Sequence, residues 1–574
     1  MGKIWRYIRP YTWYICLALL IKLSGAVAEL FIPYLMEYIL KEGASGGDTG
    51  MIFLYGGMMV LCALLCMVLN IVANRMSAKS SGKITLAIRH DLFQKLSRLS
   101  ARQMDELTVP SAESRLTSDT YNINQLLARV QRIGVRAPIL LVGGISMMLT
   151  MDAGLALIPI CLLPFIAVIV YFVTKTSLPL YTKQQGVLDR MVRTVQENIT
   201  GIRVIKALSK TEHEKARFNG VNEELAAVDR KAGSVTAITN PASSLVLNIG
   251  LTLVVLMGAY RVNDGRSDPE TLLAFLQYFT MILNAMMGVT RIFVMWSKGE
   301  ASALRVAEVL AMPEDLTVLP EQRPEQHPAH IEFRDVTFSY NGRGNNLTDL
   351  SFRLERGQTL GILGSTGSGK TTVIRLLMRL YDPDQGQILI DGKDLRTIPE
   401  EELRSKFGVV FQNDFVAGGD IAGNIRFFRD IPDKQLEKAA RDAQAEAFIA
   451  EKEGGMAAEV AFRGNNLSGG QKQRLLIARA LAGDPEILVL DDASSALDYR
   501  TDSLLRKALR ENYRDTTTVL IAQRVSSLRH ADLILVMNEG QVIGAGNHSQ
   551  LMETCEEYRI IAETQMGAES GVAV

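Results

Sequence analysis

The chain has 574 residues, more than one hydrophobic core usually organises, so at least two domains are expected. Lysine plus arginine and aspartate plus glutamate number 62 each, and this balance excludes a protein that binds nucleic acid through a general basic excess. Hydrophobic residues make up 48% of the chain, a high share for a soluble enzyme, and the five cysteines follow neither a disulfide nor a metal-binding spacing.

The N-terminal half contains six apolar stretches that are long enough to cross a bilayer, which takes about 20 residues of helix. They cover approximately residues 11–40, 51–74, 134–151, 154–175, 238–262 and 271–297. The amphipathic segment MGKIWRYIRPY precedes the first stretch and lacks a cleavage-site pattern, so we expect an interfacial helix and not a removed signal peptide. We therefore expect residues 1–312 to form an all-α membrane domain with six transmembrane helices in a lipid bilayer.

Two of the loops between these stretches are long and rich in basic residues. They cover residues 75–133 and 176–237, and the first contains Lys79, Lys83 and Arg89. The positive-inside rule places both loops and both chain termini in the cytoplasm, so a multi-pass protein of the plasma membrane is expected. Apolar residues at 3.6-residue spacing predict that both loops are long cytoplasmic helical extensions.

A few polar residues interrupt the apolar stretches. Lys22 and Glu29 lie two helical turns apart on one face of the first stretch, and buried charges in membranes usually need partners, so we expect these two to pair. Asn248, Gln277 and Asn284 either line a substrate pathway or form hydrogen bonds between helices, and the second role is favoured.

Residues 313–330 have the composition of a linker, with four prolines at positions 313, 320, 324 and 328. After them, residues 331–574 are expected to form an α/β domain with a short C-terminal tail.

The segment GSTGSGKT follows the apolar run TLGIL and precedes a helical pattern, which is the setting of a phosphate-binding P-loop. Its backbone amides and Lys370 would hold phosphates, and the Thr371 hydroxyl would reach magnesium. The residues expected at the nucleotide are Gly364, Ser365, Thr366, Gly367, Ser368, Gly369, Lys370, Thr371 and Thr372.

A second anion-binding motif, LSGGQ, begins at Leu467 and starts another helical pattern. The helix N-terminus and the small residues favour a phosphate there. The residues that would contact it are Ser468, Gly469, Gly470 and Gln471. Two phosphate-binding helix ends in one domain indicate a nucleotide that is shared between domains.

With these motifs in order, the chain resembles a half-transporter of the ATP-binding cassette (ABC) exporter type, in which an α/β P-loop nucleotide-binding domain follows the transmembrane domain. The resemblance implies that Tyr340 stacks on adenine and that Gln412 takes part in catalysis and senses Mg²⁺. It further implies that Asp491 binds Mg²⁺ together with Thr371 and that Asp498 ends the loop facing a partner cassette. ATP and Mg²⁺ are the expected cofactors. Residues 110–120 and 201–215 resemble the segments through which such exporters press short helices onto cassettes.

Two catalytic positions depart from the family pattern. Asp492 follows the magnesium-binding aspartate where the family usually has glutamate, and Gln523 replaces the usual switch histidine. Asp is one methylene shorter than Glu, and a misplacement of roughly 1 Å can cost on the order of 100-fold in rate. Gln523 cannot carry an imidazolium charge. These departures predict a site that binds ATP and hydrolyses it poorly.

The resemblance is therefore to the degenerate-site subunit of a heterodimeric, multidrug-type exporter of bacterial origin. The expected partner is a second half-transporter that carries the consensus glutamate and histidine, and the LSGGQ motif of this chain would complete the partner's competent site. The expected substrate is a small amphipathic or hydrophobic compound, namely a drug, lipid or peptide. Two alternatives fit the same residues: a regulator in which ATP gates a channel or partner without pumping, and a slow homodimeric exporter.

Overall fold

The computed structural model describes residues 2–44, 47–313, 315–320, 329–342, 344–412 and 414–570. The chain divides into two compact units. The helical unit comprises Met1–Ser97 and Pro110–Met312, and the second unit comprises Arg98–Val109 and Pro313–Val574. The predicted linker at residues 313–330 falls partly outside the described residues, and its role as a linker stays a prediction.

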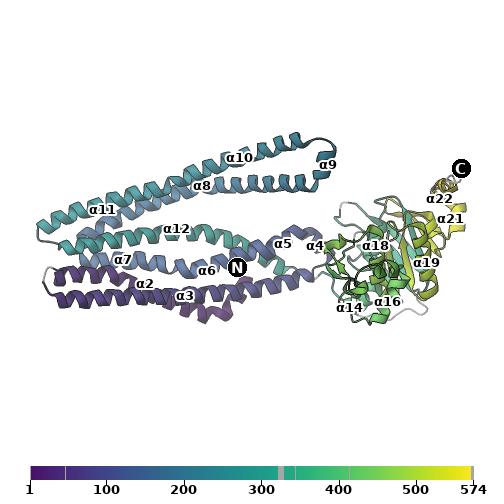
Figure 1. Cartoon of the computed structure of the whole chain (residues 1–574), viewed down its shortest axis with the longest axis horizontal. Coiled ribbons are helices and arrows are strands. Elements are labelled where there is room, and N and C mark those ends of the chain that lie inside the picture. The colour runs from purple at the N-terminus through teal and green to yellow at the C-terminus, as the bar shows by residue number, and fades with distance from the viewer. Residues whose placement is uncertain are drawn as a thin grey trace. The chain divides into compact units, whose positions relative to one another are not determined.

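The helical unit consists of long helices that run along one another (Figure 1). Its main helices are α1 (Gly2–Ile8), α2 (Thr12–Tyr38), α3 (Thr49–Ser97), α6 (Thr120–Arg129), α7 (Arg136–Met151), α8 (Ala153–Thr200), α9 (Ile202–Ala207), α10 (Thr211–Ala237), α11 (Thr239–Asn263) and α12 (Pro269–Ala311). The predicted fold class is confirmed, since the six apolar stretches lie in α2, α3, α7, α8, α11 and α12. The predicted helical extensions are also observed, because α3 continues to Ser97 and α8 to Thr200.

Five helical segments of the described chain are long and apolar enough to cross a membrane. The sixth predicted stretch lies in α12, where several side chains between residues 287 and 297 fall outside the described ones. Large apolar side chains point outward along the spans: Phe53 on α3 is 82% exposed and Leu256 on α11 is 63% exposed. Outward apolar surface of this kind suits hydrocarbon, because lipid tails are as apolar as leucine.

Small residues and one buried hydroxyl bring the inner helices of this unit together. A side chain at Gly143 of α7 would collide with Leu30 of α2, and one at Gly144 would lie 2.9 Å from Ile282 of α12. The Tyr278 hydroxyl of α12 donates to the Leu30 carbonyl at 2.5 Å. Close backbone approach and interhelical hydrogen bonds are the main sources of helix association in a bilayer.

The predicted pairing of Lys22 with Glu29 is wrong. Glu29 of α2 forms an ion pair with Arg136 of α7, whereas Lys22 donates to Asn70 and Asn74 of α3. Seven residues of helix separate Lys22 and Glu29 by about 10 Å along the axis, which exceeds the reach of an ion pair between them. Partners on neighbouring helices lie closer.

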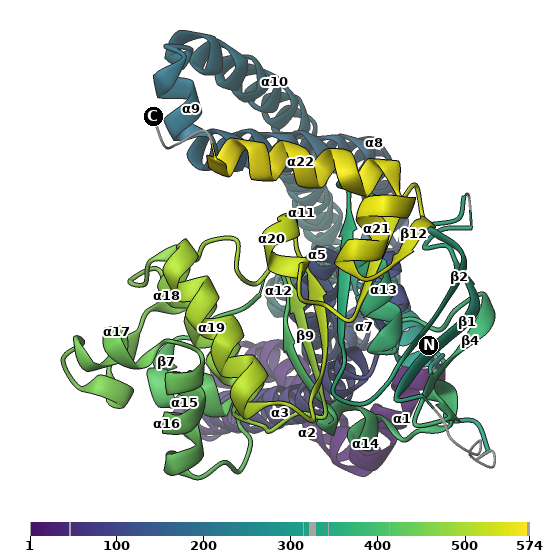
Figure 2. The same cartoon turned by 90° about the vertical axis from the view of Figure 1, so that its right-hand side faces the viewer.

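The second unit contains two main sheets (Figure 2). The antiparallel sheet has the order β2-β1-β4-β5, formed by β1 (Ile331–Phe338), β2 (Leu347–Leu354), β4 (Gln385–Ile390) and β5 (Lys393–Asp394). The other has the order β12-β11-β3-β10-β9-β6, formed by β3 (Thr359–Gly364), β6 (Phe407–Val410), β9 (Ile487–Asp491), β10 (Thr517–Ile521), β11 (Leu533–Asn538) and β12 (Gln541–Gly546). Strands β6, β9, β10, β3 and β11 pair in parallel, so their carboxyl ends share one edge.

Helices cover the sheets of the second unit. They are α13 (Lys370–Leu377), α14 (Glu400–Ser405), α15 (Ile421–Arg426), α16 (Asp433–Asp442), α17 (Glu446–Ala450), α18 (Gly469–Leu481), α19 (Tyr499–Asn512), α20 (Val525–Leu528), α21 (His548–Thr554) and α22 (Glu556–Ser570). The apolar face of α18, which includes Leu475, Ile477 and Leu481, is buried in the core under the parallel sheet. That packing fixes the exposed N-terminus of α18, where the LSGGQ motif lies.

A short helix from the N-terminal half, α4 (Ala101–Leu107), belongs to the second unit. Ser100 and Gln103 form a capping box at its start, and the Ser100 hydroxyl donates to Asp315 at 2.7 Å. The Tyr381 hydroxyl donates to Asp105 of α4 at 2.6 Å. The segment Arg98–Val109 therefore belongs to the cassette unit of this chain, whereas residues 110–120 belong to the helical unit, and their contact with a cassette stays a prediction.

Candidate nucleotide-binding site

Four neighbouring strands deliver the predicted catalytic residues to one edge of the parallel sheet. In the order β3, β10, β9 and β6, the strands end at the P-loop, just before Gln523, at Asp491, and just before Gln412. Ligands of open α/β sheets bind at the carboxyl ends of the strands. A cavity of about 260 Å³ lies there and is lined by Thr366, Gly367, Gly369, Lys370, Thr371, Thr372, Gln412, Asp491, Asp492 and Gln523, together with Asn346 and Ile521.

The P-loop takes a conformation that only glycine adopts readily. Gly367 has φ +87° and Gly369 has φ +100°, in the left-handed region. A side chain at Gly364 would collide with the Met537 carbonyl oxygen. The loop leads directly into α13, whose N-terminus favours phosphate.

Lys370 points back into this loop. Its Nζ donates to the carbonyl oxygens of Gly364 at 2.8 Å and Ser365 at 2.6 Å. Partial burial lowers the pKa of Lys370 from its ordinary value, while Asp491 and Asp492 act in the opposite direction. Ser368 is buried, and Ser365 is exposed on the outside of the loop. A phosphate entering the cavity would offer Lys370 a charged partner in place of neutral carbonyls.

Thr371, Asp491 and Gln412 form an oxygen-rich corner of the cavity. The Thr371 hydroxyl donates to Asp491 Oδ2 at 3.1 Å, and Gln412 lines the same wall. Asp491 is 2% exposed, and burial raises its pKa above the ordinary value for aspartate. Hydroxyl, carboxylate and amide oxygens are the ligands that Mg²⁺ accepts, usually together with water and substrate phosphates. These three residues fit the predicted magnesium site and would hold a Mg²⁺ ion, which would supply positive charge to balance the phosphates.

The two positions that depart from the family pattern contact each other. Gln523 Nε2 donates to Asp492 Oδ2 at 3.1 Å. Asp492 also has φ +52°, a left-handed conformation that is uncommon for a residue other than glycine and stores strain. Burial raises the pKa of Asp492, while the hydrogen bond from Gln523 and the charge of Lys370 oppose that shift. The shortened acid is thus held by the residue that replaces the switch histidine.

Tyr340 lies beside α13 but does not line the cavity. Its ring packs edge-on against Phe338 and Tyr381, with centroid distances of 4.9 and 5.1 Å. Its hydroxyl donates to Thr372 Oγ1 at 3.3 Å and accepts a hydrogen bond from Arg375 at 3.2 Å. Stacking of Tyr340 on adenine stays a prediction.

The LSGGQ residues lie apart from the lining of the P-loop cavity. Ser468 is the N-cap of α18, and Ser468 and Gln471 form a capping box in which each backbone N–H donates to the other residue's side chain. Gly469 is exposed and Gly470 half-buried, and a side chain at Gly470 would lie 3.1 Å from the Ala496 carbonyl oxygen. The start of the motif's helix is thus presented on the surface of this chain.

Asp498 is also at a helix N-terminus, as the N-cap of α19. Its carboxylate accepts from the Thr501 amide at 2.9 Å and the Thr501 hydroxyl at 2.7 Å. These hydrogen bonds hold the pKa of Asp498 below its ordinary value. Asp498 is exposed, so it can cap α19 and still face a partner.

The sequence did not point to the second cavity that meets this site. It has a volume of about 360 Å³ and is lined by Thr371, Gln412 and Asp491 together with Ala101 and Asp105 of α4, and by Arg375, Leu380, Tyr381 and Phe411. The magnesium corner and α4 therefore share one wall. The Ser-x-x-Gln spacing of the α4 capping box was the available signal for that helix.

The fold and the site define an ATP-driven membrane transporter. Residues 15–286 match the family model of the ABC transporter transmembrane region, and residues 347–495 match the family model described as ABC transporter. An uncharacterized ABC transporter ATP-binding protein of Mycobacterium tuberculosis is 31% identical over 98% of this chain and 97% of its own length. The chain belongs to the ABC transporter family.

Other relatives agree with this assignment. An uncharacterized ABC transporter ATP-binding protein of Bacillus subtilis is 31% identical over 99% of both chains. A fatty acid ABC transporter ATP-binding/permease protein of Mycobacterium bovis is 33% identical over 82% of this chain and 74% of its own length. The structure of a bacterial Atm1-family ABC exporter with ATP bound superposes with a TM-score of 0.81 at 24% identity, covering 97% of this chain and 98% of that one, and shares the fold.

Family membership establishes the coarse activity. The chain is a multi-pass membrane protein of the ABC transporter family, and its ATP-binding domain implies ATP binding, with Mg²⁺ generally used, and ATPase-coupled transport. Which site hydrolyses ATP and what is transported belong to the proposals below.

Proposed function

We propose that this chain is the degenerate-site half of a heterodimeric exporter that moves amphipathic or hydrophobic compounds out across the membrane by alternating access. The observation that carries this proposal is the hydrogen bond of 3.1 Å between Gln523 and Asp492. The two residues that differ from the family pattern contact each other, so both changes affect the same catalytic site. Its own P-loop would bind ATP and hydrolyse it poorly.

The chemistry of Asp492 and Gln523 accounts for the slow ATP hydrolysis that we propose at this site. The Asp492 carboxylate is drawn back by one methylene, and a misplacement of roughly 1 Å from the attacking water can cost on the order of 100-fold in rate. Gln523 also occupies one oxygen of the Asp492 carboxylate with its hydrogen bond. Gln523 can donate to a γ-phosphate but adds no positive charge. Binding by the P-loop and Lys370 does not depend on either residue.

The intact LSGGQ motif supports a partner with a competent site. Ser468 and Gly470 lie at an accessible helix N-terminus outside the P-loop cavity of this chain, so they are available to close over the partner's ATP. The partner would be a second half-transporter that carries the consensus glutamate and histidine. Turnover of the complex would occur mainly at the partner's P-loop.

The location and the substrate class of this exporter rest on the sequence and on relatives. The basic helical extensions support cytoplasmic termini in a plasma membrane, and the bacterial relatives support a bacterial origin. The relative named as a fatty acid transporter supports a lipid-like amphipath among drugs, lipids and peptides.

Repair of both departures tests the proposal. The double variant Asp492→Glu, Gln523→His should raise hydrolysis at the composite site on this P-loop, because the longer carboxylate reaches the attacking water and histidine restores a group that can become charged. The measurement is ATP turnover of the complex with a partner whose signature motif is consensus. The Asp492→Asn, Gln523→His variant is the matched control and should gain nothing. Equal turnover of the repaired and unaltered complexes would contradict the geometric explanation.

Export itself is tested by ATP-driven accumulation of a labelled amphipath in inverted vesicles that contain this chain with and without its partner. Accumulation should require both chains. Vesicles that bind ATP but accumulate nothing would instead favour a regulatory subunit.

A further inference from the structure

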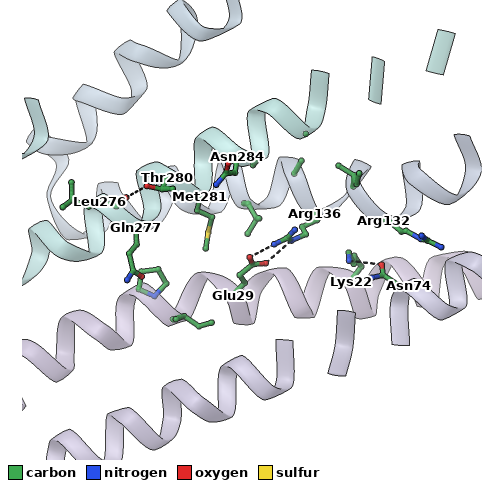
Figure 3. A pocket seen from close by; sticks show the side chains of 17 residues that line it. Lys22, Glu29, Asn74, Arg132, Arg136, Leu276, Gln277, Thr280, Met281 and Asn284 are labelled. Atoms are coloured by element: carbon green, nitrogen blue, oxygen red, sulfur yellow. Dashed lines mark hydrogen bonds and ion pairs between the residues drawn. The ribbon is translucent and has the colours of Figure 1, made fainter. Parts of the chain in front are cut away.

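The helical unit has a partly open cavity of about 960 Å³ between its inner helices. The walls come from α2, α3, α7 and α12 and from the π-helical turn η4 (Val130–Gly134) that precedes α7 (Figure 3). Its charged lining residues are Lys22, Glu29, Arg132 and Arg136. Three basic residues and one acidic residue leave the cavity lining with a net charge of +2.

Glu29 and Arg136 neutralise each other. Arg136 Nε donates to Glu29 Oε2 at 3.0 Å, and a second guanidinium nitrogen donates to Oε1 at 2.5 Å. Such a two-pronged pair fixes both side chains. Glu29 is therefore engaged and does not balance the other two cations.

Lys22 has polar but uncharged partners among the described residues. The residue is only 4% exposed, and its Nζ donates to Asn70 Oδ1 at 2.6 Å and Asn74 Oδ1 at 3.2 Å. A buried ammonium without a counter-charge is expensive, and ionisable residues within membrane helices usually mark a substrate or ion site.

Arg132 is the second cation without a carboxylate partner in the described chain. Its Nε is buried and has no hydrogen-bond partner. Buried donors of this kind are rare and call for an explanation such as a ligand. Figure 3 shows Lys22 and Arg132 toward the same end of the cavity.

The other end of the cavity combines apolar and polar side chains. Leu276 and Met281 of α12 lie there with Gln277, Thr280 and Asn284, and the Glu29–Arg136 pair lies between this end and Lys22 (Figure 3). The cavity lining also includes the apolar residues Ile32, Leu140 and Ala285. A ligand that matches the whole cavity therefore has a charged head and a hydrocarbon body.

We propose that this cavity binds an amphipathic anion, whose carboxylate or phosphate headgroup is held by Lys22 and Arg132 while its hydrocarbon chain lies along Leu276 and Met281. The inference rests on the proposed export function and narrows its substrate class. The anion supplies the counter-charge that Lys22 lacks and an acceptor for the unpartnered Arg132 nitrogen. A cationic amphipath would meet two unbalanced positive charges and be rejected.

The test is equilibrium binding to the full chain in nanodiscs without nucleotide or partner. The probes are four hydrocarbons of one chain length that end in a carboxylate, a phosphate, an alcohol or an ammonium group. At least one anionic probe should bind about tenfold or more tightly than the alcohol, since charge-assisted hydrogen bonds are roughly twice as strong as neutral ones, and the ammonium probe should bind least. The comparison between carboxylate and phosphate identifies the headgroup.

Variants assign the effect to the two cations. Lys22→Met and Arg132→Gln should each weaken the preferred anion by about tenfold and leave the alcohol nearly unchanged. Lys79→Met and Arg129→Gln are matched controls, because both residues are exposed and neither lines the cavity. If Lys22→Met does not fold, the Arg132→Gln variant and the binding of the four probes to the unaltered chain still test whether the cavity prefers an anion.

Equal binding of all four probes, preference for the ammonium probe, or equal loss of alcohol and anion in the variants would overturn the inference. Because the assay needs no transport, its result is independent of the export proposal. If anions bind through Lys22 and Arg132 but vesicles accumulate nothing, the export proposal is contradicted and the proposed binding site is supported. If vesicles accumulate neutral or cationic amphipaths with no preference for anions, the export proposal is supported and the proposed anion-binding site is contradicted.

Discussion

Substituting Gly470 by aspartate is expected to collapse ATP turnover of the complex between this chain and its partner. The new carboxylate would face the γ-phosphate of the partner's ATP, and its Cβ would lie 3.1 Å from the Ala496 carbonyl oxygen. Two unit charges about 4 Å apart repel by about 4 kcal/mol at an effective dielectric constant of about 20, which corresponds to a loss on the order of 1,000-fold. Steady-state ATPase of the purified complex measures this effect.

Two internal controls accompany that variant. Nucleotide binding to this chain's own P-loop should be unchanged in Gly470→Asp, because Gly470 does not line that cavity. Asp492→Asn should cost much less turnover than Gly470→Asp, because on the proposal above it removes an acid from a site that contributes little hydrolysis. If Asp492→Asn abolishes turnover and Gly470→Asp spares it, the assignment of the degenerate site to this chain is refuted.

The chain purified without its partner is expected to bind Mg-ATP and to hydrolyse it roughly 100-fold more slowly than the complex, given the cost of a misplaced acid. On the proposal above, Lys370, Thr371 and Asp491 would supply the binding groups, and Asp492 with Gln523 would form the impaired catalytic pair; all five residues line the cavity. The measurement compares nucleotide affinity and turnover of the lone chain and the complex in the same nanodiscs.

A Lys370→Ala variant of the lone chain is the control for binding, because it removes the charge that the phosphates need and leaves Asp492 and Gln523 in place. It should lose nucleotide affinity. Robust hydrolysis by the unaltered lone chain would favour a slow homodimer over an asymmetric pair.

Local patterns predicted most of the architecture. Apolar stretches of bilayer length and 3.6-residue spacing predicted α2, α3, α7, α8, α11 and α12 and their helical extensions, because burial in lipid or against a neighbour demands that spacing. The P-loop and the LSGGQ motif predicted two helix N-termini, and α13 and α18 begin there. These signals are contiguous in the chain and need no tertiary information.

Contacts between distant segments were not predictable in this way. Gln523 and Asp492 are 31 positions apart and meet only because β9 and β10 pair side by side. The partners of Lys22 are 48 and 52 positions away on α3, so pairing with Glu29 on its own helix was the wrong expectation. The place of α4 on the cassette likewise involves a long-range contact, the hydrogen bond from Tyr381 to Asp105.

The most direct measurement of the central claim locates the hydrolysed nucleotide in the working complex. Radiolabelled, photoreactive ATP is trapped during turnover, crosslinked, and assigned to this chain or to its partner. We expect uncleaved ATP on this chain, at the cavity formed by Lys370, Thr371 and Asp491, and trapped ADP on the partner. Trapped ADP in equal amounts on both chains would contradict the proposal that Asp492 and Gln523 make this site a poor catalyst.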